Sequence, residues 1–204
     1  MDFIKQLVFT VLVSASLISF SQNNDLEKAF SNSYTLETNG EYKKAIETLK
    51  KVYVESSYET NLRLGWLNYS AGLFTESMAF YQKSINLMPY SIEAKLGLVY
   101  PASALGNWNL VAKTYEDILH LDPANYTANY KLGLIFYGRE EFSKAFSNFQ
   151  KVVNYYPFDY NSSLMFAWTN YKLGKTREAK ILFEKVLLLS PNDKSATEGL
   201  GLIK

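Results

Sequence analysis

The chain of 204 residues contains no cysteine and a single histidine, His120. The absence of cysteine excludes disulfides, a thiol nucleophile and a lipid attached to a cysteine. One imidazole cannot supply the paired histidines of a zinc site, and the phosphate-binding pattern GxxxxGK[ST] does not occur. His120 stands shortly before Pro123, where a cation suits the end of a helix, and we interpret it as a surface or capping residue. The sequence therefore predicts a protein that is not an enzyme and that uses no metal and no cofactor.

A strong charge of either sign is also lacking. The 21 lysines and arginines are balanced by 20 aspartates and glutamates, which leaves a formal net charge of +1. Proteins that bind nucleic acid neutralise its phosphates with a basic surface, and this composition indicates none. Hydrophobic residues make up 48% of the chain, which is enough for a substantial core without metals or disulfides.

The first 21 residues differ from the rest of the chain. Lys5 gives a weakly positive start, residues 7–20 are apolar and uncharged, and small residues stand around Ser21. This order is typical of a secretory signal peptide, and we expect cleavage after Ser21. The alternative is an uncleaved anchor, but about 14 apolar residues interrupted by serines are short for a hydrocarbon layer of about 30 Å. An exported domain without disulfides suits a bacterial periplasm or cell surface, with no stable membrane span after cleavage.

Residues 126–157 predict two amphipathic helices that form a hairpin. Apolar and small residues recur three and four positions apart before and after a break at residues 138–140. They are Leu132, Gly133 and Phe136 in the first helix, and Phe142, Ala145, Phe149 and Val152 in the second. The small side chains allow the two helix axes to approach to about 8 to 10 Å, and Pro157 ends the second helix.

The same pattern recurs along the chain. Counting from Gly133, a small residue follows 12 positions on, an aromatic residue 16 on and a proline 24 on, and Gly65 and Ala167 begin the same series. Successive prolines are evenly spaced, at Pro89, Pro123, Pro157 and Pro191. The predicted repeats span approximately residues 26–57, 58–89, 90–123, 126–157 and 160–191, and a capping helix follows over 194–204.

In these features the chain resembles the tetratricopeptide repeat (TPR) proteins, whose 34-residue hairpins carry Leu-Gly, a downstream Ala-x3-Phe and a closing proline. The matching residues here are Leu132-Gly133, Ala145 with Phe149, and Pro157. The resemblance covers about five repeats, essentially everything after residue 25. It implies that the domain 22–204 has an all-α fold, a right-handed α-solenoid of about five TPR hairpins with a C-terminal capping helix. The tryptophan that often precedes Leu-Gly in this family is absent, so we expect lighter packing at that position, which holds Ala29, Asn61, Asn129 and Ser163.

Two local features modify the repeat. We expect a glycine at the sharp turn inside each later hairpin, at Gly72, Gly106, Gly138 and Gly174. With Gly97 taken as the origin of the third hairpin, its second helix begins two residues late, which indicates an insertion. Pro101 falls inside the first helix of this hairpin and predicts a kink or local bulge there.

The resemblance also implies a binding surface. In TPR proteins the first helices line a concave groove, and the residues that face it lie three before, one after and four after the small residue. In this chain the predicted partner-binding positions are Phe30, Tyr34, Leu62, Trp66, Tyr69, Leu98, Tyr130, Leu134, Tyr137, Leu164, Trp168 and Tyr171. This aromatic and nearly uncharged set does not suit a carboxylate clamp of lysine, asparagine and arginine. It favours an extended apolar or proline-rich segment of a protein partner.

These residues leave several interpretations open. Some of the side chains can pack on a neighbouring helix instead of facing a partner. Stacked tryptophan and tyrosine also suit a glycan or other small ligand, and self-association is a further possibility. A second aromatic cluster, residues 155–160, either fills the joint between two hairpins or forms a contact patch on the outer rim. The function that the sequence favours is a non-catalytic protein-protein interaction adaptor or scaffold in the cell envelope.

Overall fold

The computed structural model describes residues 24–203, which form helices and short turns with no strand. The predicted signal peptide, residues 1–21, lies outside the described residues. The chain divides into two compact units, with the boundary between Leu105 and Gly106. Each unit is built from helical hairpins with a core of its own.

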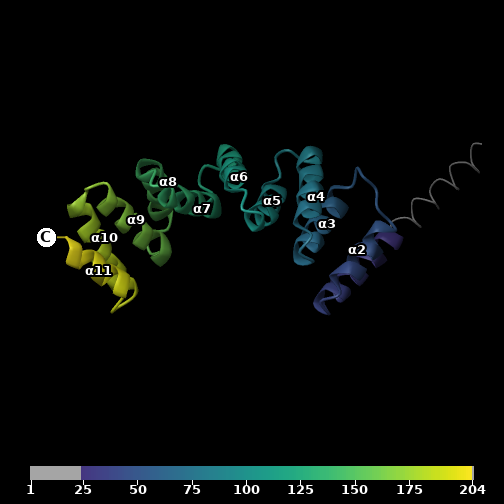
Figure 1. Ribbon diagram of the computed structural model, residues 1–204, viewed down its shortest axis with the longest axis horizontal. Coiled ribbons are helices and arrows are strands. Elements are labelled where there is room, and N and C mark those ends of the chain that lie inside the picture. Colours follow the sequence, from purple (N-terminus) through teal and green to yellow (C-terminus); the bar gives the residue numbers. More distant parts are fainter. Residues whose placement is uncertain (1–23, 204) are drawn as a thin grey trace, which may run out of the picture. The chain divides into compact units, whose positions relative to one another are not determined.

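The first unit contains a helical segment over residues 24–38 and four further helices (Figure 1). Helices α2 to α5 pack on one another in sequence order, and α3 also packs on α5. Its core is built around Ala45, Leu49, Leu64 and Leu67, which are fully buried. The helices are α2 (Tyr42–Lys50), α3 (Tyr58–Ser70), α4 (Phe74–Leu87) and α5 (Ile92–Ala104).

The second unit continues the same arrangement. Each helix packs on the next, α7 also packs on α9, and α9 also packs on α11. Ala167, Ala179, Phe183, Val186 and Ala196 form a cluster of buried residues near its C-terminal end. The helices are α6 (Trp108–Leu121), α7 (Tyr126–Gly138), α8 (Phe142–Tyr155), α9 (Tyr160–Lys172), α10 (Thr176–Leu189) and α11 (Lys194–Leu202).

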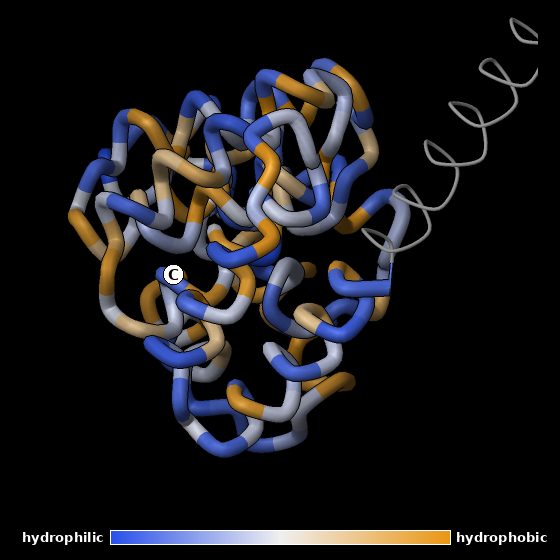
Figure 2. The backbone as a smooth tube through the Cα atoms, turned by 90° about the vertical axis from the view of Figure 1, so that its right-hand side faces the viewer, coloured by the Kyte–Doolittle hydropathy of each residue, from blue (hydrophilic) through white to orange (hydrophobic). Residues whose placement is uncertain are grey.

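Hydrophilic and hydrophobic residues alternate within single turns of the helices (Figure 2). This alternation is typical of amphipathic helices that bury one face and expose the other. In α8, for example, Ala145, Phe149 and Val152 are buried, whereas Lys144 and Lys151 are exposed.

Helices α3, α5, α7, α9 and α11 begin at the same position of the repeat. Each is preceded by a polar residue whose side chain accepts a hydrogen bond from the backbone N–H three residues on. These N-cap residues, each one repeat length from the next, are Ser57, Ser91, Asn125, Asp159 and Asp193. A side-chain cap satisfies an otherwise unpaired N–H of the first turn and contributes about 1 kcal/mol, so the caps help to fix where each helix starts.

Glycines set the distance between neighbouring helices. A Cβ atom on Gly97 of α5 would overlap the ring of Tyr81 in α4, and one on Gly65 of α3 would lie 3.0 Å from the same ring. In the second unit, Gly133 lies against Phe149 and Gly199 against Phe183 in the same way. Each ring therefore occupies space that only the absence of a side chain leaves open.

The predicted insertion in the third repeat is wrong. Helix α5 has 13 residues and α6 has 14, the same lengths as α7 and α8, and three residues connect the helices in both cases. The position equivalent to Gly65, one repeat length on, is Val99 and not Gly97, which faces the preceding hairpin instead. Pro101 lies inside α5, and the helix continues beyond it to Ala104.

The turn inside each hairpin uses a left-handed residue at one fixed position. Gly40, Gly72, Gly106 and Gly174 have φ between 70° and 76° there. In the fourth hairpin this position is Glu140, with φ of 61°, and not the predicted Gly138, which is the last residue of α7. A side chain in this conformation costs about 1 to 2 kcal/mol relative to glycine, so Glu140 is a strained position.

The light packing predicted where many family members carry tryptophan is wrong for Asn61 and Asn129. Asn61 and Asn129 are buried at this position, as is Lys95 in the third repeat. The side chain of each donates a hydrogen bond to a backbone carbonyl six residues earlier, at Glu55, Pro123 and Pro89 respectively. A polar side chain that ties down the preceding turn thus takes the place of a large apolar one.

Candidate functional site

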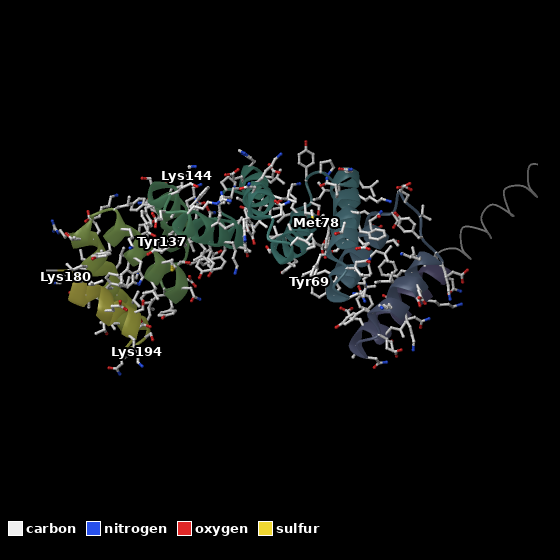
Figure 3. The ribbon with its side chains drawn as sticks, viewed as in Figure 1. Tyr69, Met78, Tyr137, Lys144, Lys180 and Lys194 are labelled. Atoms are coloured by element: carbon white, nitrogen blue, oxygen red, sulfur yellow. The ribbon has the colours of Figure 1, made fainter. Side chains whose placement is uncertain are left out.

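An aromatic patch lies on the first helices of the first unit. The ring centroids of Trp66 and Tyr100 are 6.2 Å apart and nearly perpendicular, and Tyr69 packs against both at 5.8 and 5.5 Å. Trp66 is 37% exposed and Tyr100 is 50% exposed. Tyr69 lies among the side chains of α3 and α5 (Figure 3). These three residues, together with Tyr34, which is 54% exposed, are called the aromatic patch below.

A closed set of polar contacts lies beside the patch. The Trp66 indole Nε1–H donates to one carboxylate oxygen of Glu37 at 2.5 Å, and the Arg63 guanidinium forms an ion pair with the other at 2.5 Å. Arg63 also donates to the Ser33 hydroxyl at 3.1 Å and lies 3.8 Å from the centroid of the Tyr34 ring. The charges next to the patch are therefore paired with each other, and Arg63 is only 8% exposed.

The Tyr81 ring beneath the patch explains why the aromatic side chains of the patch adjoin one another. Tyr81 is 3% exposed and is in contact with both Gly65 and Gly97. Burial raises the pKa of the Tyr81 phenol well above its ordinary value, so the ring is neutral over the physiological range. Because the two glycines let α3 and α5 approach the same ring, Trp66 and Tyr100 on these helices meet at the surface.

The predicted residues of the first unit have different environments. Tyr34 and Trp66 are exposed, whereas Phe30, Leu62 and Tyr69 are half-buried. Leu98 is 4% exposed and belongs to the interior. The structure places Tyr100 in the patch instead. Counting groove positions from Gly97 does not predict this residue. The signal was present in the sequence, because Tyr100 stands one repeat length after Trp66.

In the second unit, Tyr130 and Tyr137 of the predicted set pack partly against other aromatic rings. Tyr130 stacks on Tyr126 at 6.0 Å and meets the buried ring of Phe149 edge-on at 6.1 Å. Tyr137 packs against Phe142 at 5.4 Å. Burial raises the pKa of both Tyr130 and Tyr137. Leu134 is half-buried in the same unit.

Trp66 and Trp168 stand in the same short pattern, Trp-x-Asn-Tyr, but Trp168 has a different environment. Its Nε1–H donates to the Ser195 hydroxyl of α11 at 2.9 Å, and its ring lies 5.0 Å from that of Phe183. Leu164 and Tyr171 pack with it against the buried cluster of this unit. Trp168 therefore contributes to holding α11 on α9 and α10, and it is half-buried.

The second aromatic cluster is mostly exposed near the joint between α8 and α9, and only Tyr160 packs against the buried cluster of this unit. Tyr155, Tyr156 and Phe158 are 64%, 49% and 74% exposed. The ring of Tyr156 stands perpendicular to that of Tyr126 at 5.3 Å. Together with Pro157 and Asp159 these side chains line an open hollow of about 520 Å³ on the surface of the second unit.

Two further features bear on function. His120 is exposed in the last turn of α6. Among residues 24–203, no group of three histidine, aspartate or glutamate side chains could hold a metal ion. Over the same residues, none of the helices combines the length and the apolar character that crossing a membrane requires.

Comparison with known proteins agrees with this helical-hairpin architecture. Residues 127–159 and residues 160–193 each match a family model described as tetratricopeptide repeat. The chain thus belongs to the class of proteins built from repeated helical hairpins. More particularly, it is a tetratricopeptide repeat protein, and the predicted all-α solenoid fold is confirmed. Repeats of this class present extended surfaces that mediate protein-protein interactions.

Several solved structures share the fold. The crystal structure of MamA superposes with a TM-score of 0.71 at 22% identity, covering 82% of this chain and 92% of MamA. A tetratricopeptide repeat protein from Parabacteroides merdae ATCC 43184 gives 0.74 at 20% identity, covering 87% of this chain and 71% of that one. MamA from Desulfovibrio magneticus RS-1 gives 0.69 at 20% identity, covering 83% and 97%. At these identities the likeness shows the fold alone. No curated protein sequence matches the chain.

Proposed function

We propose that this protein is a non-catalytic adaptor or scaffold that binds an extended apolar or proline-rich segment of a protein partner on the aromatic patch. The observation that carries the proposal is the exposed pair of Trp66 and Tyr100, whose ring centroids lie 6.2 Å apart on neighbouring first helices. Exposed aromatic side chains that adjoin one another on a soluble domain usually mark an interaction site.

The chemistry of the patch favours this kind of partner. Tryptophan and tyrosine combine a large apolar surface with few rotatable bonds, and residues of these types commonly cost about 2 kcal/mol or more when truncated in an interface. An extended proline-rich segment leaves its backbone carbonyls unpaired and can be docked between aromatic rings. The hydroxyls of Tyr34 and Tyr100 supply donors near such a segment.

The charges beside the patch do not favour a partner carboxylate. A clamp for a C-terminal carboxylate needs basic side chains that are free to converge on it. Arg63 is the basic residue at this place, and Glu37 and Ser33 already hold it. Drawing Arg63 away would leave the partly buried Glu37 carboxylate without its ion-pair partner, which is costly.

We further infer that the protein is exported and acts in the bacterial envelope, in the periplasm or at the cell surface. The support is the order of residues 1–21 and the absence of cysteine from the chain. N-terminal sequencing of the protein isolated from an envelope fraction tests the inference. A mature chain that begins at Gln22 supports cleavage after Ser21, and a chain that retains residues 1–21 in the cytoplasm contradicts it.

Affinity capture from the native envelope fraction tests the binding proposal. The baits are the parent domain, the double variant Trp66→Ala/Tyr100→Ala, and a control variant Trp108→Ala. Trp108 is a suitable control because it is 53% exposed in α6 and lies outside the patch. Circular dichroism must show that all three baits are equally helical.

The proposal predicts a protein that the parent and the Trp108→Ala bait retain and that the double variant loses. Equal retention by all three baits would show that another surface binds the partner. If no bait retains a protein, the adaptor proposal fails, and the glycan or small-ligand alternative becomes the better account of the exposed rings.

A further inference from the structure

The surface hollow of the second unit combines aromatic walls with one carboxylate. Its lining consists of Tyr126, Tyr155, Tyr156, Pro157, Phe158 and Asp159. The perpendicular rings of Tyr126 and Tyr156 form a corner, and Tyr155 and Phe158 are 64% and 74% exposed. The volume of about 520 Å³ lies within the range of sites that take small ligands.

The Asp159 carboxylate gives the hollow a negative charge that the described residues leave unpaired. One oxygen caps α9 by accepting the backbone N–H of Ser162 at 2.8 Å, and the other accepts the Tyr126 hydroxyl at 3.1 Å. Both donors are neutral, and Asp159 takes part in none of the ion pairs found among residues 24–203. No basic side chain lines the hollow either. The faces of aromatic rings are themselves electron-rich, so rings and carboxylate both attract a cation.

A lysine of the same chain shows that a ring of this cluster is accessible to an ammonium group. The Lys185 Nζ atom of α10 lies 5.8 Å from the centroid of the Phe158 ring. This separation is within the range of about 6 Å over which a cation is attracted to an aromatic face. The other rings of the hollow have no such partner among the cation contacts of the described residues.

We propose that the hollow lined by Tyr126, Tyr155, Tyr156, Phe158 and Asp159 binds the ammonium group of a lysine side chain from a partner protein. The alkyl stem of lysine packs on the exposed rings while its charged end reaches the carboxylate. A purely apolar occupant would instead desolvate the edge of the Asp159 carboxylate without pairing it. The site lies in the second unit, so the inference is independent of the binding proposed for the aromatic patch of the first.

Two short peptides that differ only at the ammonium group test the charge. The probes are acetyl-Ala-Lys-Ala-amide and the same peptide with norleucine in place of lysine, titrated into the mature chain and followed by the ring resonances of the hollow. The expected result is saturable shifts with the lysine peptide and at least about fivefold weaker binding of the norleucine peptide, because a partly exposed cation–aromatic contact is worth about 1 kcal/mol. Equal binding of both peptides, or no shifts with lysine, would overturn the proposal.

Two matched caps provide the variant and its control. Asp159→Asn removes the charge and keeps a residue that caps helices well, as Asn125 does at the equivalent position of α7. Asp193→Asn makes the same change at the cap of α11, outside the hollow. The lysine peptide should bind the Asp159→Asn chain several-fold more weakly and the Asp193→Asn chain unchanged. An equal affinity for all three chains would contradict the proposed role of Asp159.

Discussion

The ring of Trp66 meets that of Tyr100 edge-on, although a full repeat separates them in the chain. The two side chains occupy the same position in successive repeats, on α3 and α5, and these helices pack on each other. The approach depends on Tyr81 below them, whose ring lies against glycines of both helices. The packing of the interior therefore decides which aromatic side chains adjoin one another on the surface.

Two glycines of α11 provide a matched test of the packing of a helix glycine against a buried aromatic ring. A Cβ on Gly199 would overlap the buried ring of Phe183, whereas one on Gly201 would meet nothing within 4 Å. Gly199→Ala should lower the free energy of unfolding by about 1 to 3 kcal/mol, the usual cost of overpacking a tight interior. Gly201→Ala should leave it unchanged or raise it by up to about 1 kcal/mol, since alanine favours a helix. Urea unfolding of the two variants measures both effects, and equal stabilities would contradict the packing described.

Glu140 offers a stabilising substitution. Its φ of 61° is the left-handed conformation that glycine supplies at the same turn of the other hairpins. Glu140→Gly should raise the free energy of unfolding by up to about 1 kcal/mol, because the relief of backbone strain is partly offset by the greater freedom of glycine in the unfolded chain. Gly174→Ala, at the equivalent turn, should lower it by about 1 kcal/mol. Denaturant midpoints of the two variants should therefore move in opposite directions, and a loss of stability in Glu140→Gly would refute the assignment of strain.

The contact between Tyr160 and Asp193 predicts a dependence on pH. The Tyr160 hydroxyl donates to the Asp193 carboxylate at 2.5 Å, and the backbone N–H of Ala196 donates to its other oxygen. The hydrogen bond from Tyr160, followed by that from Ala196, holds the pKa of Asp193 below its ordinary value of 3.8. Since the folded state binds this proton less readily than the unfolded chain, the stabilisation is present above about pH 4 and is lost as the pH falls through the lowered pKa.

Tyr160→Phe removes the principal donor to Asp193 and isolates this effect. The variant should be less stable than the parent at pH 7, and the difference should shrink as the pH is lowered from 4 towards 2. Urea unfolding at several pH values measures it. Asp193→Asn, which keeps a cap without a charge, should likewise flatten the acid dependence. A difference between parent and Tyr160→Phe that stays constant down to pH 2 would show that the contact does not depend on the charge of Asp193.

The helices could be predicted from the sequence because the residues that begin and end them recur once in every repeat, as their apolar faces do. Evenly spaced prolines mark the ends of the second helices, and capping residues such as Asp159 and Asp193 stand at the same interval. Each hairpin therefore confirms the position of the next. The family resemblance added the expected pairing of helices, which short-range periodicity alone does not provide.

The incorrect predictions concern positions where a glycine can have either of two structural roles, or where another residue takes the role of glycine. The repeat pattern predicts Gly97 as the small residue of its own hairpin, but Gly97 makes room for Tyr81 of the preceding one. A glycine in a helix indicates a close neighbour without saying which neighbour it is. Glu140 shows the converse, because the turn conformation at that position is imposed by the repeat even though the residue does not favour it.

Exposure at the predicted surface could not be read from the motif either. Trp66 and Trp168 stand in the same short pattern, yet Trp168 is tied to Ser195 of α11 while Trp66 remains more exposed beside Tyr100. The two tryptophans differ in exposure because the neighbouring helix α11 offers Trp168 a hydrogen-bond acceptor. Such a neighbour becomes visible only when the hairpins are packed together.

Site-specific photo-crosslinking in intact cells tests the central claim most directly. A photoreactive phenylalanine analogue is placed at Tyr100 of the aromatic patch and, as a control, at Ile181, which is 56% exposed on α10 in the other unit. The account predicts a crosslinked partner protein from position 100 that is absent or much weaker from position 181. No crosslink from position 100, or one equally strong from position 181, would contradict the claim that the patch of Trp66 and Tyr100 is the partner-binding surface.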